Sequence, residues 1–120
     1  MAGTYTSLWV ITPRTRKAGD IVDVQAVIQN IHGYILVVDA RGAVDGTPLN
    51  FGVGLILNPG EVGVSYASFV MPARDVIVSV GSWVGQLLDD SAEEIILLEE
   101  PPPPEEPEFS GFSVTQYITR

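Results

Sequence analysis

Few side chains in this sequence are of the types that catalyse reactions or bind metals. The 120 residues include one histidine and no cysteine, so a thiolate zinc site or a disulfide framework is excluded. The histidine, His32, lies in a glycine-containing turn and is interpreted as a loop residue. Gly52-Val-Gly54 lacks the helix that follows a phosphate-binding loop, and we interpret it as room for close packing. We therefore predict no catalytic residues, no cofactor and no enzyme activity.

An acidic cluster is the main concentration of possible metal ligands. It consists of Asp89, Asp90, Glu93 and Glu94. Carboxylates can bind Ca²⁺, but this cluster lacks the alternating spacing and the glycine of an EF-hand loop. We therefore predict a solvated loop over residues 85–93, with at most a helical turn near residues 87–94, and no metal site.

The charge balance bears on possible partners. Fifteen acidic residues against six basic ones give a formal net charge of −9, which argues against nucleic acid as a partner. Arg14, Arg16 and Lys17 are clustered, so one end of the domain is expected to be locally positive and to attract an acidic segment of a neighbour. The sequence shows neither a signal peptide pattern nor an apolar stretch of about 20 residues, so no membrane partner is expected.

The last twelve residues resemble the opening strand of the chain. Tyr5–Arg16 and Phe109–Arg120 share an aromatic residue, a small polar pair, a large apolar residue, a valine and a final Thr-Arg in the same order. The segment between the domain and this arm, Glu99–Glu108, is acidic and contains four consecutive prolines, which predict a stiff polyproline II spacer. A strand on such a spacer has unpaired backbone groups, so we predict that it adds to the sheet of a neighbouring subunit.

The predicted interaction residues lie mainly in this arm. Phe112, Val114, Gln116 and Ile118 alternate along it, and Phe109 precedes them. The alternatives are that the arm is unpaired or that it begins a second domain of a longer protein.

Two tryptophans, Trp9 and Trp83, lie on predicted strands and are candidate binding residues. Trp9 is the sixth predicted interaction residue, because its neighbours Leu8 and Val10 already supply the opposite face of the strand and an exposed aromatic residue marks an interface. Trp83 is expected to pack in or beside the core rather than to form a sugar platform.

Alternating apolar and polar residues, interrupted by Gly, Pro, Asn and Asp, predict strands throughout. Asp45-Gly46 predicts a hairpin, and Asn58-Pro59-Gly60-Glu61 predicts a type II turn. The fold expected is all-β: an immunoglobulin-like seven-stranded β-sandwich over residues 1–98, followed by the spacer 99–108 and the C-terminal strand arm 109–120. The seven strands are expected at residues 5–11, 21–30, 34–40, 51–57, 62–71, 75–84 and 95–98.

Two stretches resemble known immunoglobulin-like modules. Ala18–Asn30 is similar to the G-x-x-V-x-V-x-A-x-I-x-N second strand of CARDB-type domains. Pro59-Gly-Glu61, with Ser68–Pro72 and Asp75–Val78, resembles the "PGE … SFxMP … DVxV" pattern of small bacterial and phage-borne domains. The resemblance implies a structural or binding role, as a spacer, adhesive unit, decoration protein or tail component.

These observations favour a non-enzymatic structural protein of a virion, such as a bacteriophage decoration, capsid or tail component. Such a protein would be assembled in the host cytoplasm, and it would bind copies of itself or other virion proteins by strand exchange. The alternative is an extracellular or cell-surface protein: an adhesive or carbohydrate-binding module, or a filament subunit.

Overall fold

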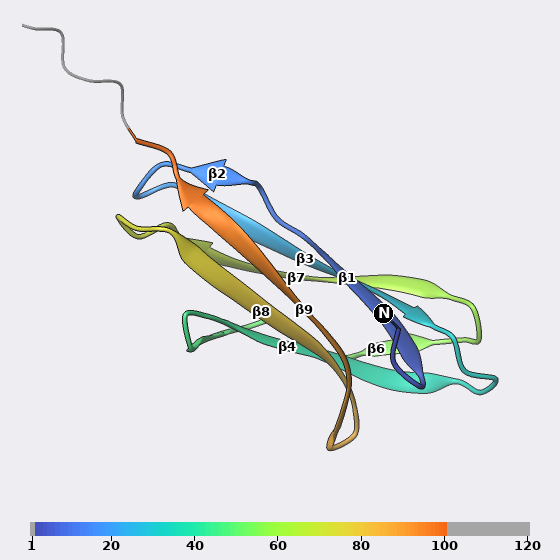
Figure 1. Ribbon diagram of the computed structural model, residues 1–120. Coiled ribbons are helices and arrows are strands. Elements are labelled where there is room, and N and C mark those ends of the chain that lie inside the picture. The colour runs from blue at the N-terminus through green and yellow to red at the C-terminus, as the bar shows by residue number, and fades with distance from the viewer. Residues whose placement is uncertain (1, 101–120) are drawn as a thin grey trace, which may run out of the picture.

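The computed structural model describes residues 2–100. The predicted interaction residues from Phe109 to Ile118 therefore lie outside the described residues, and their predicted role stays a prediction. Within the described range, two β-sheets pack face to face (Figure 1). Their strands are β1 (Thr6–Ile11), β2 (Thr15–Arg16), β3 (Ile21–Asn30), β4 (Leu36–Val44), β5 (Thr47–Leu49), β6 (Leu55–Leu57), β7 (Val62–Val70), β8 (Val76–Val84) and β9 (Leu87–Leu98).

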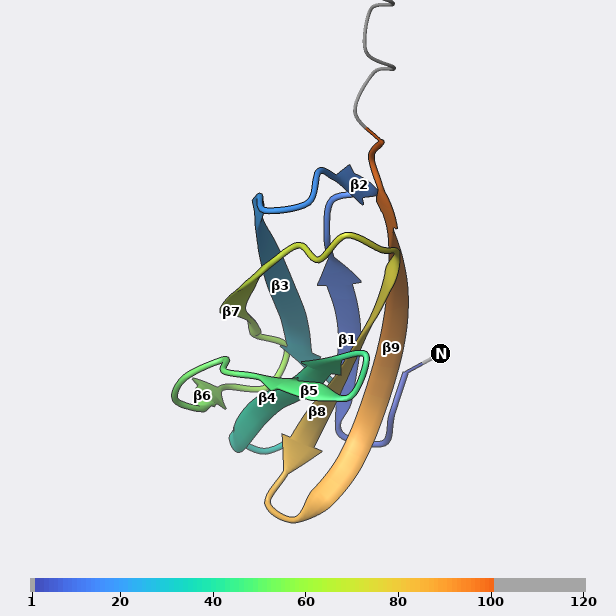
Figure 2. The same ribbon diagram turned by 90° about the vertical axis from the view of Figure 1, so that its left-hand side faces the viewer.

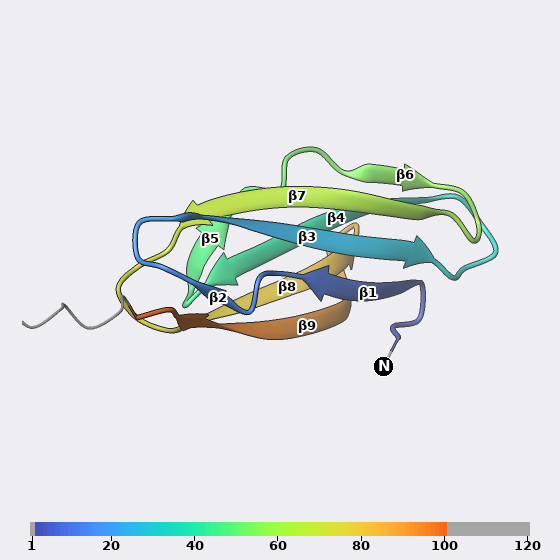
Figure 3. The ribbon, with the colours of Figure 1, turned by 90° about the horizontal axis from the view of Figure 1, so that it is seen from above.

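The first sheet has three strands in the order β1-β3-β7, so β1 and β7 form its two edges (Figure 3). The second sheet runs β2-β9-β8-β4-β5, and β6 also pairs with β4. Every pair is antiparallel except β2 with β9. The chain passes from the first sheet to the second between β1 and β2, where Pro13 lies. Seen from the end, β7 and β6 lie on one side of the sandwich and β9 on the other (Figure 2).

The core fills the space between the sheets, and strand alternation determines which residues enter it. On β3, Val22, Val24, Ala26 and Ile28 are fully buried, as their shared face predicted. The valines of β8 face them from the second sheet. The buried core cluster consists of Leu8, Val22, Val24, Ala26, Ile28, Leu36, Val38, Ala40, Val44, Phe51, Leu57, Ala67, Met71, Val76, Val78, Val80 and Ile96.

Both predicted turns are present. Asp45 and Gly46 have φ angles of 47° and 87°, as a type I′ hairpin between β4 and β5 requires. Gly60 has φ 82°, and the N–H of Glu61 donates to the carbonyl of Asn58 at 2.9 Å, which closes a type II turn. The all-β sandwich is confirmed, with two short additional strands, β2 and β5.

The predicted strand over residues 51–57 is shorter than expected. Only Leu55–Leu57 pairs, as β6. Phe51 turns into the core, and Gly52 has φ 80°, a conformation that interrupts a strand. Gly54 lies so close to Asp39 that a Cβ there would overlap the carboxylate, which agrees with the predicted close packing.

The predicted loop over residues 85–93 is wrong. This stretch belongs to β9, which begins at Leu87 directly after the hairpin turn at Gly85 and runs for twelve residues, and no helical turn forms there. The acidic residues suggested a solvent-exposed loop. In the structure, the carboxylates of Asp89 and Asp90 instead accept hydrogen bonds from backbone N–H groups of the other sheet. A further short strand, β2, lies between the first two predicted strands and pairs with the end of β9.

Candidate interaction surfaces

The carboxylate of Asp89 on β9 is enclosed by the start of the chain. Its oxygens accept hydrogen bonds from the backbone N–H groups of Thr4, Tyr5 and Thr6 at 2.7–3.1 Å and from the Thr6 hydroxyl at 2.6 Å. The Thr6 hydroxyl also lies 2.7 Å from that of Ser82, and both residues are fully buried. One carboxylate thus joins the two sheets.

Asp90 makes the next contact along the same edge, because its carboxylate accepts the N–H of Leu8 at 2.8 Å. The N–H of Ile31 donates to the carbonyl of Tyr5, so the odd-numbered residues of β1 bond to β3. In an antiparallel pair the alternate residues point away, and the N–H groups of Thr6 and Leu8 therefore face the free edge. Two aspartates occupy the positions that another strand would otherwise fill.

A β-bulge allows two consecutive side chains to make these contacts. Ser82 pairs with Asp90, but Trp83 pairs with Leu88, so Asp89 is the extra residue of β9. Successive residues of a regular strand point to opposite faces, whereas a bulge changes the direction of a side chain. Asp89 and Asp90 can therefore both be directed at β1.

The hydrogen bonds control the ionisation of Asp89. Burial raises the pKa of its carboxyl group, but the hydrogen bonds from the Thr6 hydroxyl and from the N–H groups of Tyr5, Thr6 and Thr4 outweigh burial and hold the pKa below its ordinary value of 3.8. Asp89 is therefore charged at neutral pH, as an acceptor of four donors should be.

The other edge of the three-stranded sheet, β7, has no such cover. Asn30 donates its N–H to Glu61, and Met71 donates its N–H to Asp20, which fixes the alternation at both ends of the β3–β7 ladder. The alternate residues of β7 then direct their N–H and C=O groups away from β3. Within residues 2–100, no strand pairs with this edge. The residues whose backbone N–H and C=O groups point away from β3 are Val62, Val64, Tyr66, Ser68 and Val70.

Two hollows line the second half of β7. The larger hollow has a volume of about 420 Å³ and lies between β7 and the β4–β5 hairpin. Its lining residues are Val44, Thr47, Pro48, Leu49, Asn50, Ser68, Phe69, Val70, Pro72 and Arg74. The second, of about 380 Å³, is lined by Asp23, Asn50, Tyr66, Ala67 and Ser68. The first half of β7 is closed, because Leu55 and Leu57 of β6 pack against Gly63.

The outer face of the three-stranded sheet is mainly apolar, although β3 also presents Gln25 and Gln29 there. Trp9, Val27 and Val64 lie side by side across the three strands. Trp9 is 44% exposed, whereas its neighbour Val27 is only 8% exposed. Asp23 is the single charged residue on this face of β1, β3 and β7. Trp9 is thus exposed on this face, which meets the condition set for an interface residue, and its role at an interface stays a prediction.

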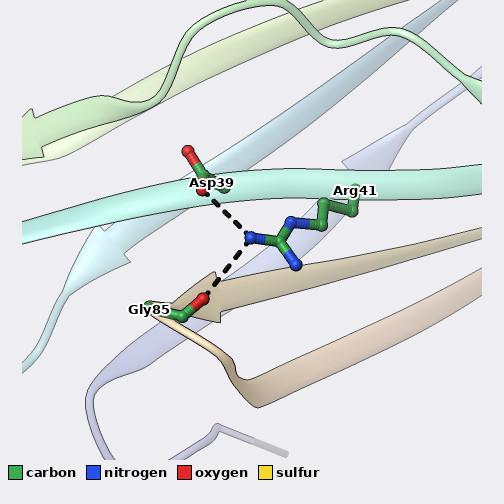
Figure 4. Close-up of polar contacts among 3 residues, drawn as sticks. All are labelled: Asp39, Arg41 and Gly85. Carbon is green, nitrogen blue, oxygen red and sulfur yellow. Dashed lines mark hydrogen bonds and ion pairs between the residues drawn. The ribbon is translucent and has the colours of Figure 1, made fainter.

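Trp83 lies on the outer face of the second sheet and is half-buried. The guanidinium of Arg41 stacks over its ring at 4.7 Å, and Arg41 also contacts the Asp39 carboxylate at 3.3 Å and the Gly85 carbonyl at 3.4 Å (Figure 4). A Cβ at Gly81 would collide with Leu88 and approach the indole nitrogen. Trp83 therefore packs against Arg41 on the outer face, and the expectation that it packs in or beside the core is wrong, because it belongs neither to the core cluster nor to the side chains packed against it. It borders a shallow groove of about 630 Å³ with a floor of small residues.

The remaining candidates give no chemical site in the described range. The His32 ring packs edge-on against Tyr5, with centroids 4.9 Å apart, as a structural loop residue. No group of three or more histidine and carboxylate side chains in residues 2–100 is placed to hold a metal ion. The same residues contain no helix long and apolar enough to cross a membrane.

Sequence reasoning missed the two residues that join the sheets. Asp89 and Asp90 were considered only as calcium ligands or loop residues. The signal that could have found them is the pair of aspartates inside an otherwise strand-compatible run from Leu87 to Leu98, because adjacent polar residues break the alternation where a bulge lies. The open edge of β7 carries no comparable signal in the sequence.

Comparisons with known proteins identify the fold. No family profile and no curated protein matches the chain. The domain is similar to a CARDB domain from Pyrococcus furiosus, crystallised in complex with di-metal ions, with 14% identity and a TM-score of 0.64 over 82% of this chain and 93% of that chain. The solution structure of the same domain gives 15% identity and a TM-score of 0.66, and covers 82% and 97% of the two chains.

Other proteins share the architecture. A chain of the complex between zinc 2-glycoprotein and prolactin inducible protein from human seminal plasma has 16% identity and a TM-score of 0.63, covering 81% of this chain and 96% of that one. Part of an exo-chitosanase from Amycolatopsis orientalis has 17% identity and a TM-score of 0.54, covering 78% and 13%. The fold of residues 2–100 is therefore the immunoglobulin-like β-sandwich of CARDB-type domains.

Proposed function

We propose that this protein is a non-enzymatic assembly subunit that binds other copies of itself by strand addition, with the arm 109–120 of one copy added to a sheet edge of another. The observation that carries the proposal is the unpaired edge of β7, beside hollows that reach the gap between the sheets. An exposed strand edge is a template for pairing with another chain.

The apolar outer face of the three-stranded sheet supports the same function. Trp9 and Tyr66, which is 63% exposed, lie on the edge strands of this face, where side chains of an incoming strand and its subunit would be in reach. Aromatic residues are enriched at protein interfaces, and charged residues are depleted at their centres. A face with Asp23 as its single charge fits that composition.

The setting proposed for this assembly is a virion, as a decoration, capsid or tail component. That setting depends on the resemblance of Pro59-Gly-Glu61, Ser68–Pro72 and Asp75–Val78 to phage-borne immunoglobulin-like domains. The CARDB-type fold is compatible with it, because a small sandwich with a strand arm needs no catalytic site to act as a building block.

The proposal is tested by the solution mass of the full chain, measured by light scattering across a concentration series. We expect a defined oligomer, with a mass at least twice the 12.9 kDa of one chain. A chain that ends at Glu100 should be monomeric, and so should full-length Val114→Asp, in which a charge replaces one of the predicted apolar anchors. Circular dichroism and thermal unfolding check that each variant keeps the sandwich.

Two outcomes overturn this function. A monomeric full chain at all concentrations removes the assembly role. An oligomer that persists in both variants shows that the arm is not the assembly element, and then the apolar outer face becomes the interface to test with Trp9→Ala.

A carbohydrate-binding surface module is the second candidate, and the exposure of two aromatic residues favours it. Trp9 is half exposed and Tyr34 is 74% exposed, whereas Trp83 is covered by Arg41. This function requires a monomer that binds a glycan array and loses that binding with Trp9→Ala. The same scattering measurement therefore separates the two candidates.

A further inference from the structure

We propose that the acceptor for the C-terminal arm is the edge of β7 from Val64 to Phe69, and that its occupant is the segment 112–117 of a second copy, paired antiparallel to β7. This inference rests on the proposed function and adds the acceptor edge, the direction and the register. It follows from three properties of the described residues: the accessibility of the edges, the shape beside β7 and the direction of the strands.

Most strand edges in the described range are occupied. The free N–H groups of Thr6 and Leu8 on β1 are bonded to Asp89 and Asp90. In the second sheet, β2 covers the end of β9 at Leu97 and Leu98, and β5 and β6 cover the two ends of β4. The middle of β9 pairs only with β8, but in the described part of the chain no hollow for inward side chains lies beside its free edge. Within residues 2–100 no strand pairs with the β7 edge, and beyond Gly63, where β6 packs, its outward backbone groups are available to an added strand.

The hollow between β7 and β5 gives an added strand a place for its inward side chains. A strand beside β7 would continue the sheet, so its alternate residues would enter the gap between the sheets, next to Ala67 and Phe69. That gap contains the 420 Å³ hollow, lined partly by Val44 and Leu49. β6 packs against the start of β7 at Gly63. The accessible part of the β7 edge therefore runs from Val64 to Val70.

The arm matches this site in pattern. Phe112, Val114, Gln116 and Ile118 alternate along it, and the first three would lie within the accessible part of the edge. The corresponding residues of the similar opening strand are informative, because Leu8 and Val10 on β1 point into the gap between the sheets. The arm would thus pair with β7 as β1 pairs with β3, with its alternate apolar side chains in the gap between the sheets.

One polar residue fixes the register. Among the inward residues of β7, Ser65 has the only hydroxyl, and it is 5% exposed. Gln116 is the one polar residue among the four alternating arm positions. Placing Gln116 beside Ser65 gives both polar groups a partner in the gap. In the antiparallel direction this pairs Phe112 with Phe69 and Val114 with Ala67.

Strand direction favours a second copy over the chain's own arm. β8 is antiparallel to β9, and β7 and β8 meet at the end of the domain where β9 ends, so β7 and β9 run the same way (Figure 3). An arm that runs straight on from β9 is antiparallel to β7 only in a copy that faces the first. To pair antiparallel with the β7 of its own chain, the arm would have to reverse its direction within the proline-rich spacer. Residues 101–108 of that spacer would span about 25 Å when extended.

Two facing copies that exchange arms form a closed two-fold dimer, the commonest symmetric oligomer. The acidic residues of each spacer then approach the end of the partner where Arg74 lines the hollow and where Arg14, Arg16 and Lys17 lie near the end of β9. These basic side chains are the groups at this end that an acidic spacer would contact.

The test is a pair of cysteines in the full chain, which has no native cysteine. In the proposed register Ser68 of one copy lies opposite Ser113 of the other as a hydrogen-bonded pair, with Cα atoms about 5.5 Å apart, within the range of a disulfide. The variant Ser68→Cys/Ser113→Cys should give a covalent dimer on mild oxidation, without higher species on a non-reducing gel. The matched control is Ser7→Cys/Ser113→Cys, because Ser7 lies on the same outer face at the closed β1 edge; it should give no dimer.

The outcomes separate the two proposals. If the unmodified chain is monomeric, the proposed function fails. If the unmodified chain is oligomeric but the Ser68 pair does not cross-link, or cross-links no more than the Ser7 control, the β7 acceptor is wrong and the assembly role stands. A disulfide within one chain overturns the second copy as occupant, and a ladder of larger species overturns the closed dimer.

Discussion

The two edges of the three-stranded sheet differ in whether their outward backbone groups are hydrogen-bonded. The free edge of β1 is bonded to the carboxylates of Asp89 and Asp90, which come from the other sheet. The free edge of β7 meets no such side chains in residues 2–100, and hollows lie beside it. Carboxylates at an edge accept hydrogen bonds and repel an incoming strand's carbonyl groups. One edge is thus closed by side-chain hydrogen bonds, while the other keeps the unpaired backbone groups that an added strand needs.

The largest expected effect contrasts two neighbouring residues of β7. Ala67→Pro removes an N–H that bonds to β3 and places the ring in the core, and we expect a loss of about 3 kcal/mol in the free energy of unfolding. Ser68→Pro removes an N–H that points to the open edge, so the sandwich should lose less than about 1 kcal/mol. Urea unfolding measures both.

Light scattering then provides the second measurement on Ser68→Pro. This variant should be a folded monomer, because the added strand loses a donor in the middle of its site. If Ser68→Pro unfolds as readily as Ala67→Pro, the assignment of inward and outward N–H groups on β7 is wrong.

The next effect concerns the closed edge. Asp89→Ala leaves the N–H groups of Tyr5 and Thr6 and the Thr6 hydroxyl without their acceptor, and we expect the free energy of unfolding to fall by about 2 kcal/mol. Glu93→Ala on the same strand is the control; its exposed contact with Ser79 should contribute less than about 0.5 kcal/mol. Equal losses in the two variants would contradict the role assigned to Asp89.

Acid should weaken the closed edge selectively. Because the folded-state pKa of Asp89 lies below 3.8, its contribution to stability is complete above the unfolded value and is lost as the pH falls through the folded value. Urea midpoints measured from pH 7 to pH 2 should therefore fall less steeply below pH 4 in Asp89→Asn than in the unmodified protein. Asp45, whose pKa is lowered by the Ile77 N–H and Arg74, contributes to both curves equally. Parallel curves would refute the assignment.

The smallest effect on the fold is expected at the rim of the open edge. Arg74 is exposed and pairs with Asp45 at 3.0 Å, so Arg74→Gln should not measurably shift the urea midpoint. Its effect should appear instead in association, as a weaker dependence of the dimer dissociation constant on salt. Analytical ultracentrifugation at two ionic strengths measures this, and an unchanged salt dependence would remove the acidic spacer from the contact.

Alternation predicted the strands well where one face is buried and the other is polar. β3 was predicted at its observed limits, and the glycine-dependent turns at Gly46 and Gly60 were predicted because few other residues adopt their φ angles. The start of β9 was missed because the carboxylates of Asp89 and Asp90 are hydrogen-bond acceptors. Either water or backbone N–H groups can donate to them. A sequence does not tell which partner is present when the donors lie more than 80 residues away.

The open edge could not be predicted for a similar reason. Whether β7 is an edge or a central strand depends on the order of strands in the sheet, and Val62–Val70 alternates in the same way in either case. Trp9 was predicted from its strand neighbours alone, because Leu8 and Val10 fix which face remains outside. Local pattern thus gives the face of a residue, whereas the neighbour across a sheet edge is a property of topology.

The long β9 strand has a mechanical consequence. The chain enters the sandwich beside the start of β9, where Asp89 contacts Thr4, and leaves it at the end of the same strand, after Leu98 (Figure 1). Tension applied between the two ends therefore acts along β1 and β9 rather than across them. The ladder bonds lie perpendicular to that direction, so they share the force in shear instead of opening one after another. A subunit tethered by its arm would extend little before its contacts failed together.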